Sequence, residues 1–312
     1  MRRFLVLSFV LFNFIFVFSL KIGISQIVDH PALNSIYEGV IDALHAESIQ
    51  ADIDYQNAQG IFQNALAIAK KFKNDADFVV AISTPSAQAA KNEIDDKPIV
   101  FSAVSDPVGA GLIENWGKNT SNVVGISDML PIETHFKLMK VIMPTKKNIA
   151  ILYNPGEANS KFILDRSKNI GNKIGLNIIE VAGSNVNELI TSVNSNIDII
   201  DVVYLITDNL VSSSVEILSK IFYDNKIPVV ASDVEIAKKA AFIGFGFDYH
   251  SMGWATGKIL IRLINGESTS DIESQIIDPI YLNLYVNLKR AENAGIVVPK
   301  NIINKADILI KE

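Results

Sequence analysis

Short apolar segments alternate along the chain with segments whose apolar residues recur at helical spacing. In the first half, Leu33, Ile36 and Val40 follow Pro31 at such spacing and predict an amphipathic helix that begins at the proline. The segments predicted to be strands there are Ile22 to Ser25, Ala51 to Tyr55, Phe78 to Ser83, Pro98 to Val104 and Val123 to Ile126. Continuous apolar strands separated by helices are typical of parallel sheets covered on both faces.

The same pattern occurs a second time. Residues 148–160 repeat the strand, polar turn and helix of residues 21–34, and Lys226 to Asp233 resembles Lys97 to Asp106. The second series of predicted strands is Ile149 to Tyr153, Leu176 to Val181, Val202 to Ile206, Pro228 to Ala231 and Ala241 to Gly244. Helices are expected over Glu133 to Met143, from Asn159 onward, and over Tyr249 to Asn265.

The repeat predicts an α/β protein of two similar doubly wound parallel-sheet lobes. We expect the chain to cross between the lobes near residues 126–129, 244–248 and 276–280. The first lobe would then comprise residues 20–126 plus 247–276, and the second residues 127–246 plus 277–312. Three crossings make a hinge with limited freedom, which suits closure around a ligand.

The N-terminus has the features of a signal peptide over residues 1–19. Two arginines follow Met1, Phe4 to Phe18 is almost wholly apolar, and Val17 and Ser19 suit cleavage near Ser19. An uncleaved anchor is the alternative, although a spanning helix needs roughly 20 apolar residues and this run is shorter. The segment predicts export.

Composition narrows the functional classes. The 312 residues carry a net charge of −6, which gives no basic footprint for nucleic acid. The absence of cysteine excludes disulfides, thiolate metal sites, a cysteine nucleophile and a lipid-modified N-terminal cysteine. The chain has no P-loop and no G-x-G-x-x-G after the first strand, and its four histidines lack metal-ligand spacing. We therefore expect no enzyme, cofactor or metal site, and take a monomer as the default.

Small polar residues end the predicted strands, where open parallel sheets bind ligands. Thr84, Ser86 and Ala87 open one helix, and residues 157–160 open another; such helix starts suit a carboxylate. Asp106 and Asp208 are the carboxylates placed to meet a cation, and no lysine or arginine occurs at these strand ends. The set favours a zwitterionic amino acid, although each residue alone is also an ordinary helix cap.

Four motifs in order resemble those of bacterial ABC-transporter substrate-binding proteins of the tryptophan/tyrosine-binding type. They are residues 24–34, 83–90, 104–112 and 153–160, and the resemblance extends from about Lys21 to Asp307. It implies a periplasmic-binding-protein fold of type I, with two lobes and three crossings. It also implies capture of a small solute, with an aromatic amino acid favoured, for delivery to a membrane permease and ATPase.

The resemblance also places the site residues. On the first lobe they would be Gln26, Thr84, Ser86, Ala87, Ser105 and Asp106, and on the second Asn154, Glu157, Asn159, Ser160, Asp208 and Asp233. Many family members carry a lipid-modified cysteine, which this chain lacks, so we expect it in a periplasm or held by its leader. A sugar or nucleoside as ligand, or a role as the ligand-sensing partner of a membrane receptor, remain the alternatives.

Overall fold

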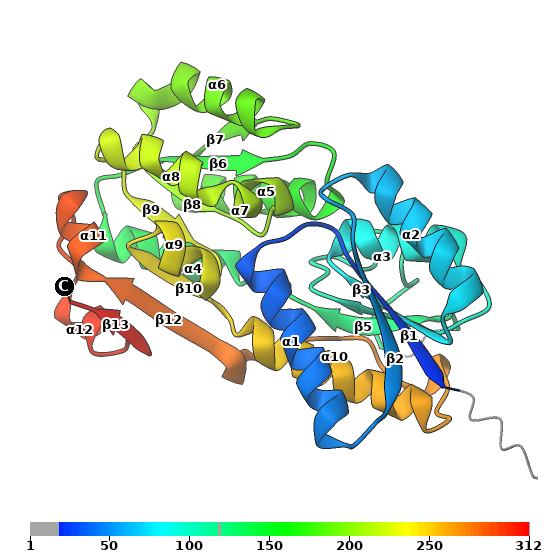
Figure 1. Ribbon diagram of the computed structural model, residues 1–312. Helices are drawn as coiled ribbons and strands as arrows, with labels where there is room; N and C mark the ends of the chain where they lie inside the picture. The colour runs from blue at the N-terminus through cyan, green and yellow to red at the C-terminus, as the bar shows by residue number, and fades with distance from the viewer. Residues whose placement is uncertain (1–18, 118–119, 312) are drawn as a thin grey trace, which may run out of the picture.

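The computed structural model describes residues 19–117 and 120–311, which form two α/β lobes side by side (Figure 1). Each lobe has a sheet at its centre and helices on both faces, as the alternating pattern predicts. The predicted signal peptide lies, but for its last residue, outside the described residues. No helix in the described part of the chain combines the length and the apolar character needed to cross a membrane.

The sheet of lobe 1 has the order β11-β5-β4-β3-β1-β2, and all of its neighbouring strands are parallel. Its strands are β1 (Leu20–Gln26), β2 (Ala51–Asn57), β3 (Phe78–Ile82), β4 (Ile99–Ser102), β5 (Val123–Ser127) and β11 (Gln275–Ile276). Its helices are α1 (Pro31–Ala46), α2 (Phe62–Asp75), α3 (Thr84–Glu93) and α10 (Tyr249–Ile264), with a short 3-10 turn at Thr269–Asp271.

The sheet of lobe 2 has the order β13-β12-β10-β9-β8-β6-β7 and is parallel except where β12 runs against β10. Its strands are β6 (Asn148–Tyr153), β7 (Asn177–Ala182), β8 (Val202–Leu205), β9 (Val229–Ala231), β10 (Ile243–Phe247), β12 (Leu282–Asn287) and β13 (Ile308–Ile310). The helices are α4 (Ile132–Ile142), α5 (Ala158–Ile174), α6 (Val186–Asn196), α7 (Asn209–Ser213), α8 (Val215–Asp224), α9 (Val234–Ala240), α11 (Leu288–Asn293) and α12 (Lys300–Ile303).

The chain passes between the two sheets three times. It leaves lobe 1 between the end of β5 at Ser127 and the start of α4 at Ile132. It returns at Asp248, between β10 and α10, and crosses again between Ile276 and Leu282. These segments join the lobes at one side of the molecule and form the hinge expected for this fold class (Figure 1).

Several predicted strand boundaries differ from the observed ones by up to three residues, and two of these differences have a clear local cause. The strand predicted over residues 98–104 ends at Ser102, because Ala103 has φ +54° and turns the chain out of the sheet. The strand predicted to begin at Ala241 begins at Ile243, because the Ala241 N–H still donates to the Ala237 carbonyl at the end of α9. The first correction lies at the carboxyl end of its strand, which faces the other lobe, and the second lies at the amino end of β10, away from it.

Helices α1 and α10 pack against each other unusually closely on one face of the lobe 1 sheet (Figure 1). A Cβ atom on Gly39 would lie 2.1 Å from the His250 carbonyl oxygen, and one on Gly253 would lie 2.1 Å from that of Ile36. Only residues without a side chain allow this approach. Because α10 follows the second hinge crossing, the contact fixes that crossing to the body of lobe 1.

Candidate ligand-binding site

An enclosed pocket lies between the lobes, at the carboxyl ends of their parallel strands. We call it the inner pocket, and its hollow is about 20 Å³. From lobe 1 and the hinge it is lined by His30, Ala32, Leu33, Ser83, Thr84, Ala103, Ser105, Asp128 and Tyr249, and from lobe 2 by Asn159, Thr207, Asn209, Ser212 and Asp233. A hollow of this size takes one or two water-sized groups. Among these lining residues there is no lysine or arginine.

Two buried carboxyl groups reach the inner pocket from opposite sides. Asp128, directly after β5, accepts hydrogen bonds from Ser105 Oγ (2.9 Å) and Tyr249 OH (3.1 Å). Asp233, two residues after the end of β9, accepts one from the Ile236 N–H (2.7 Å) and so caps α9. Burial raises the pKa of the Asp128 carboxyl, and it raises the pKa of the Asp233 carboxyl to about 7, with smaller contributions from the charge of Glu235 and then from that of Asp128. The two groups therefore form an acidic site without a cation of the protein's own.

The start of α3 presents polar groups that have no partner. The Ser83 side chain does not cap the helix, and its backbone has φ +82°, a strained conformation for a residue with a side chain. The hydroxyl oxygens of Ser83, Thr84 and Ser86 are buried without a hydrogen-bond partner. Buried polar atoms normally have a partner, and helix N-termini attract anions. This turn is consequently suited to hold a carboxylate.

The start of α5 is held by carboxyl groups of lobe 2 itself. Asp208 accepts from Ser160 Oγ (2.6 Å), from the Asn154 N–H (2.6 Å) and from the Val211 N–H (2.8 Å). Glu157 accepts from the Asn209 N–H (3.3 Å), and burial, followed by the charge of Asp208, raises the pKa of Glu157 to about 7. These bonds tie the turn before α5 to the turn before α7. Asp208 thereby serves as an internal scaffold rather than lining the inner pocket.

The lobes touch across the inner pocket. His30 of lobe 1 lies with Nε2 3.5 Å from Asn209 Oδ1 of lobe 2, and Ser105 Oγ lies 3.5 Å from Thr207 Oγ1. Burial lowers the pKa of His30 to about 4, which keeps its ring neutral at neutral pH. The molecule is therefore in an arrangement in which both lobes enclose the pocket.

A second, larger hollow lies beside the inner pocket, and we call it the outer cavity. It measures about 700 Å³ and is also lined from both lobes. Phe62 at the start of α2 and Pro85 in α3 contribute from lobe 1, and Glu157 and Leu210 contribute from lobe 2. Asn209 lines both hollows, so the two are neighbours.

The structure distributes the residues predicted from the sequence among several places. Thr84, Ser105, Asn159 and Asp233 line the inner pocket, and Asn154 and Glu157 line the outer cavity. The other six line neither. Ser86 and Ala87 are buried in α3, and Ser160 donates to Asp208. Gln26 donates to Val28 O and Asn34 Oδ1, and Asp106 accepts from the Gly109 N–H (3.0 Å). Their part in ligand binding stays a prediction.

Sequence reasoning missed Asp128, which ends β5 and stands at the first hinge crossing. The rule that ligands bind beyond strand ends would have included it, but the segment was interpreted only as a hinge. Thr207 and Asn209, which follow the end of β8 by two and four residues, and Ser212 in α7 are likewise absent from the predicted site residues. The Tyr249 hydroxyl, which donates to Asp128 (3.1 Å), also lines the pocket.

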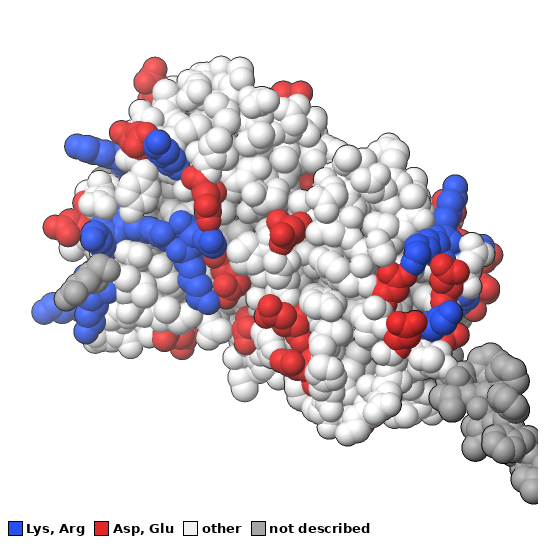
Figure 2. Space-filling model, viewed as in Figure 1, with Lys and Arg blue, Asp and Glu red and all other residues white. Residues whose placement is uncertain are grey.

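The distribution of charge on the surface agrees with the absence of lysine and arginine from the lining of the inner pocket. In Figure 2 lysine and arginine gather over the two outer ends of the molecule, whereas the middle of this face carries acidic and uncharged residues. The described residues contain no group of three or more His, Asp or Glu arranged to hold a metal ion.

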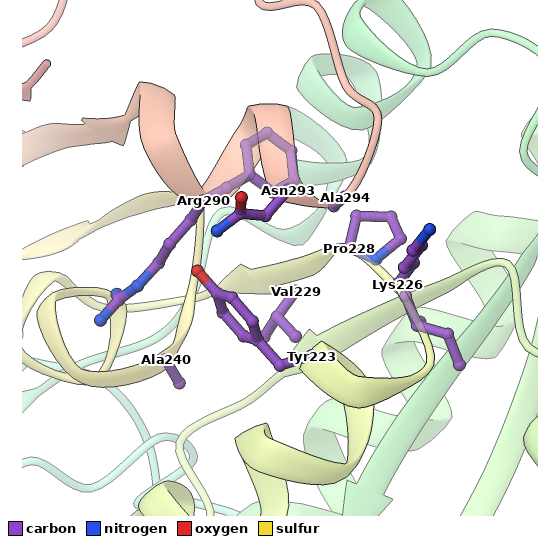
Figure 3. Close-up of a pocket in the computed structure, with 10 residues that line it drawn as sticks. Tyr223, Lys226, Pro228, Val229, Ala240, Arg290, Asn293 and Ala294 are labelled. Atoms are coloured by element: carbon purple, nitrogen blue, oxygen red, sulfur yellow. The ribbon is translucent and has the colours of Figure 1, made fainter. Parts of the chain in front are cut away.

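A separate hollow at the far end of lobe 2, between α8, β9 and α11, is shown in Figure 3. It measures only about 10 Å³. The Arg290 guanidinium beside it donates to the carbonyls of Ala237 (2.8 Å), Lys239 (2.9 Å) and Ala241 (3.2 Å). Arg290 therefore closes the end of α9, and this hollow is a feature of packing.

Two parallel-sheet lobes, a three-crossing hinge and an enclosed polar pocket between the lobes define a two-lobe solute-binding protein. The sequence model of the ABC transporter substrate binding proteins matches residues 21–310. The chain belongs to this family, whose members bind small ligands, work with ABC transporter components and are generally extracytoplasmic. It is accordingly a binding protein and not an enzyme.

Individual relatives agree with this assignment. The chain is 39% identical to the tyrosine-binding protein of Clostridioides difficile over 263 residues, 83% of this chain and 76% of the relative. It superposes with a TM-score of 0.88 on an ABC domain in complex with L-Trp from Streptococcus pneumonia, at 30% identity, covering 93% of this chain and 100% of the other. The TM-score is 0.69 for a ligand-free, open substrate-binding protein with adhesive properties from Clostridium difficile. That superposition has 39% identity and covers 94% of this chain and 99% of the other.

Proposed function

We propose that this protein captures a free aromatic amino acid between its lobes and delivers it to an ABC import system. The observation that carries the proposal is the pair Asp128 and Asp233, buried carboxyl groups from opposite sides of a pocket whose described lining holds no lysine or arginine. A buried charge needs a partner of opposite charge. The ammonium group of an amino acid is that partner, and it fits a hollow of about 20 Å³.

The carboxylate of the amino acid binds at the start of α3. Ser83 and Thr84 line the inner pocket there with buried hydroxyl groups that have no partner, and the helix N-terminus adds unpaired N–H groups. Charge-assisted hydrogen bonds of this kind are shorter and stronger than neutral ones. The ammonium and carboxylate sites together select a zwitterion over a simple cation or anion.

The relatives support both the ligand class and a motion of the lobes. One relative is named for tyrosine, and another was solved with L-Trp. Our structure superposes better on the L-Trp complex, at 30% identity, than on the ligand-free open protein, at 39% identity. A difference in this direction is what a closed arrangement of the lobes produces. In the proposed cycle the ligand docks on lobe 1, and hinge closure brings Asp233 and Asn159 onto it.

Closure links binding to transport. Only the closed shape brings both lobes into the relative position that the permease recognises, so the ligand acts by shifting the population toward it. The hinge segments around Asp128 and Asp248 are the points about which the lobes move. We place the boundary between the lobes so that lobe 1 comprises residues 20–126 plus 247–276 and lobe 2 residues 127–246 plus 277–312.

Part of the binding free energy offsets the cost of closing the lobes. We therefore expect a Kd of about 1 μM, which corresponds to about −8 kcal/mol.

The proposal also includes export into a periplasm by a leader that is then cleaved. It further includes a monomeric state of the protein. A sugar or a nucleoside is the alternative ligand, but neither brings a cation to Asp128 and Asp233. Transport rather than sensing is favoured by the family, whose members work with ABC transporters.

The test is a thermal-shift screen of the purified protein after unfolding and refolding to remove carried-over ligand. The panel contains the common amino acids, several sugars and nucleosides, and calorimetry then gives the Kd of each compound that raises the Tm. A rise with tryptophan, tyrosine or phenylalanine supports the proposal. A rise with a sugar or nucleoside and with no amino acid overturns it.

A further inference from the structure

We propose that the side chain of the captured amino acid occupies the outer cavity, and that Phe62 and Leu210 determine the preference for a large, flat, apolar side chain. This inference rests on the proposed function, since it begins from an amino acid whose ammonium lies in the inner pocket. Phe62 comes from lobe 1 and Leu210 from lobe 2, so both contacts form only when the lobes are together.

Size separates the roles of the two hollows. The inner pocket measures about 20 Å³, and the outer cavity about 700 Å³. The first admits an ammonium group but not an aromatic ring, whereas the second is of the size typical of small-molecule sites, about 300–1,000 Å³. A ligand that places its ammonium between Asp128 and Asp233 must therefore direct its side chain elsewhere.

The helix starts connect the two hollows. In α3, Thr84 lines the inner pocket and the next residue, Pro85, lines the outer cavity. In α7, Asn209 lines both, and Leu210 faces the outer cavity. The carboxylate site at the start of α3 thus lies between the ammonium site and the outer cavity. An L-amino acid bound at the first two sites has its third substituent directed into the outer cavity.

The lining of the outer cavity matches an aromatic side chain. Apolar groups come from both lobes, namely Ile27, Val28, Phe62 and Pro85 from lobe 1 and Val186 and Leu210 from lobe 2. Glu157 is the charged side chain among the lining residues, and it already accepts from Asn209 and Asn159. Phe62 is 36% exposed, so its ring has free surface for a ligand ring to cover. Aromatic pairs gain from such contact beyond the area that they bury.

The outer cavity, at about 700 Å³, is larger than one aromatic ring needs. Ligand analogues with a larger ring substituent therefore test the inference. We would measure binding of L-tyrosine, O-methyl-L-tyrosine, N-acetyl-L-tyrosine and L-tyrosine amide by calorimetry. The methyl group on the ring is expected to change the Kd less than tenfold, whereas either change at the head group abolishes binding. Loss of O-methyl-L-tyrosine binding with L-tyrosine binding intact would place the ring in a closed space and overturn the inference.

Substitutions test the two named residues. Phe62→Ala and Leu210→Ala are each expected to raise the Kd for L-tryptophan about five- to tenfold, from the apolar area lost to the ligand ring. Ile61→Ala is the matched control, because Ile61 precedes Phe62, is 49% exposed and is not among the residues lining the cavity. It should keep the Kd within twofold of the unmodified protein.

The outcomes separate this inference from the proposed function. If Phe62→Ala and Leu210→Ala bind L-tryptophan as the unmodified protein does, or if Ile61→Ala weakens binding equally, the side chain lies elsewhere and the inference fails. In either case tight binding to the unmodified protein leaves the proposed function standing. If the unmodified protein binds no amino acid, the proposed function fails, and the inference fails with it.

Discussion

Replacing Asp233 by asparagine tests the ammonium site directly. Asp233 is 2% exposed, and its Oδ1 accepts from the Ile236 N–H at 2.7 Å. Asparagine is as good an N-cap as aspartate, so Asp233→Asn keeps the cap of α9 while it removes the negative charge. The fold should therefore be retained, and the effect on binding should come from the charge.

The magnitude follows from the partners that remain. Removing one member of a buried charge pair costs about 2–5 kcal/mol. Asp128 stays on the other side of the pocket and keeps part of the attraction, so we expect about 2–3 kcal/mol. This corresponds to a Kd raised about 30- to 150-fold.

Ligand affinity and the stability of the ligand-free protein should both depend on pH, in opposite directions. Burial raises the pKa of Asp233 to about 7, so the group is protonated below that pH and ionised above it. An ammonium ligand requires the ionised form, so binding should weaken as pH falls from 7.5 to 5.5, by about 20-fold. In the ligand-free protein the sign is opposite: the raised pKa contributes stability that is fully present near pH 4 and is lost as pH rises through 7.

The assay is calorimetry with L-tryptophan at several pH values, together with Tm measurements on the ligand-free protein. Glu157 and Asp128 also have raised pKa values, so the comparison of Asp233→Asn with the unmodified protein isolates the part of Asp233. Asp201→Asn is the matched control, because its carboxylate accepts from the backbone N–H groups of Lys147 (3.0 Å) and Asn148 (2.9 Å) and is not among the residues lining the inner pocket. A Kd within threefold of the unmodified protein for Asp233→Asn would refute the ammonium site.

Three further substitutions, one of them with a control variant, test closure and packing. Asn209→Ala removes the contact with His30 across the lobes (3.5 Å) and should speed ligand dissociation about three- to tenfold in stopped-flow experiments; an unchanged rate would show that this contact does not hold the lobes together. Gly253→Ala places a Cβ 2.1 Å from the Ile36 carbonyl oxygen and should lower the free energy of unfolding, measured in urea, by about 2 kcal/mol or more. Lys258→Ala on the same helix is the control. It removes only an exposed ion pair with Glu47 and should lower the free energy of unfolding by less than about 1 kcal/mol. Tyr204→Phe leaves the buried His135 Nδ1 without its hydroxyl partner and should cost about 1–3 kcal/mol in lobe 2; a Tm equal to that of the unmodified protein would contradict this.

Much of the architecture follows from local patterns in the sequence. The alternation of apolar strands and amphipathic helices predicts two parallel sheets, because a strand buried on both faces is apolar throughout. The repeat of residues 21–34 at residues 148–160 predicts two lobes of one design, and the structure has β1 with α1 and β6 with α5 at these places. Small polar residues at the strand ends predict a ligand site between the lobes.

The individual site residues are less accessible to sequence reasoning. Aspartate follows strands β8 and β9 alike, yet Asp208 is taken up by Ser160, Asn154 and Val211, whereas Asp233 reaches the inner pocket. The sequence alone favoured Asp106 and Asp208 as cation partners, whereas the carboxyl groups that line the inner pocket are those of Asp128 and Asp233. Which carboxylate is free depends on the donors that other segments supply, and these segments are far apart in the sequence.

The sequence by itself determined the class of fold, the polar character of the strand ends and the absence of cysteine chemistry, because each depends on residue type and spacing alone. The tertiary structure decided which strand ends face the same pocket, how the two hollows adjoin at α3 and α7, and why Gly39 and Gly253 have no side chain. These properties depend on distances between atoms of different lobes or helices. Such distances are set only when the hinge and the packing of α1 against α10 fix the lobes in space.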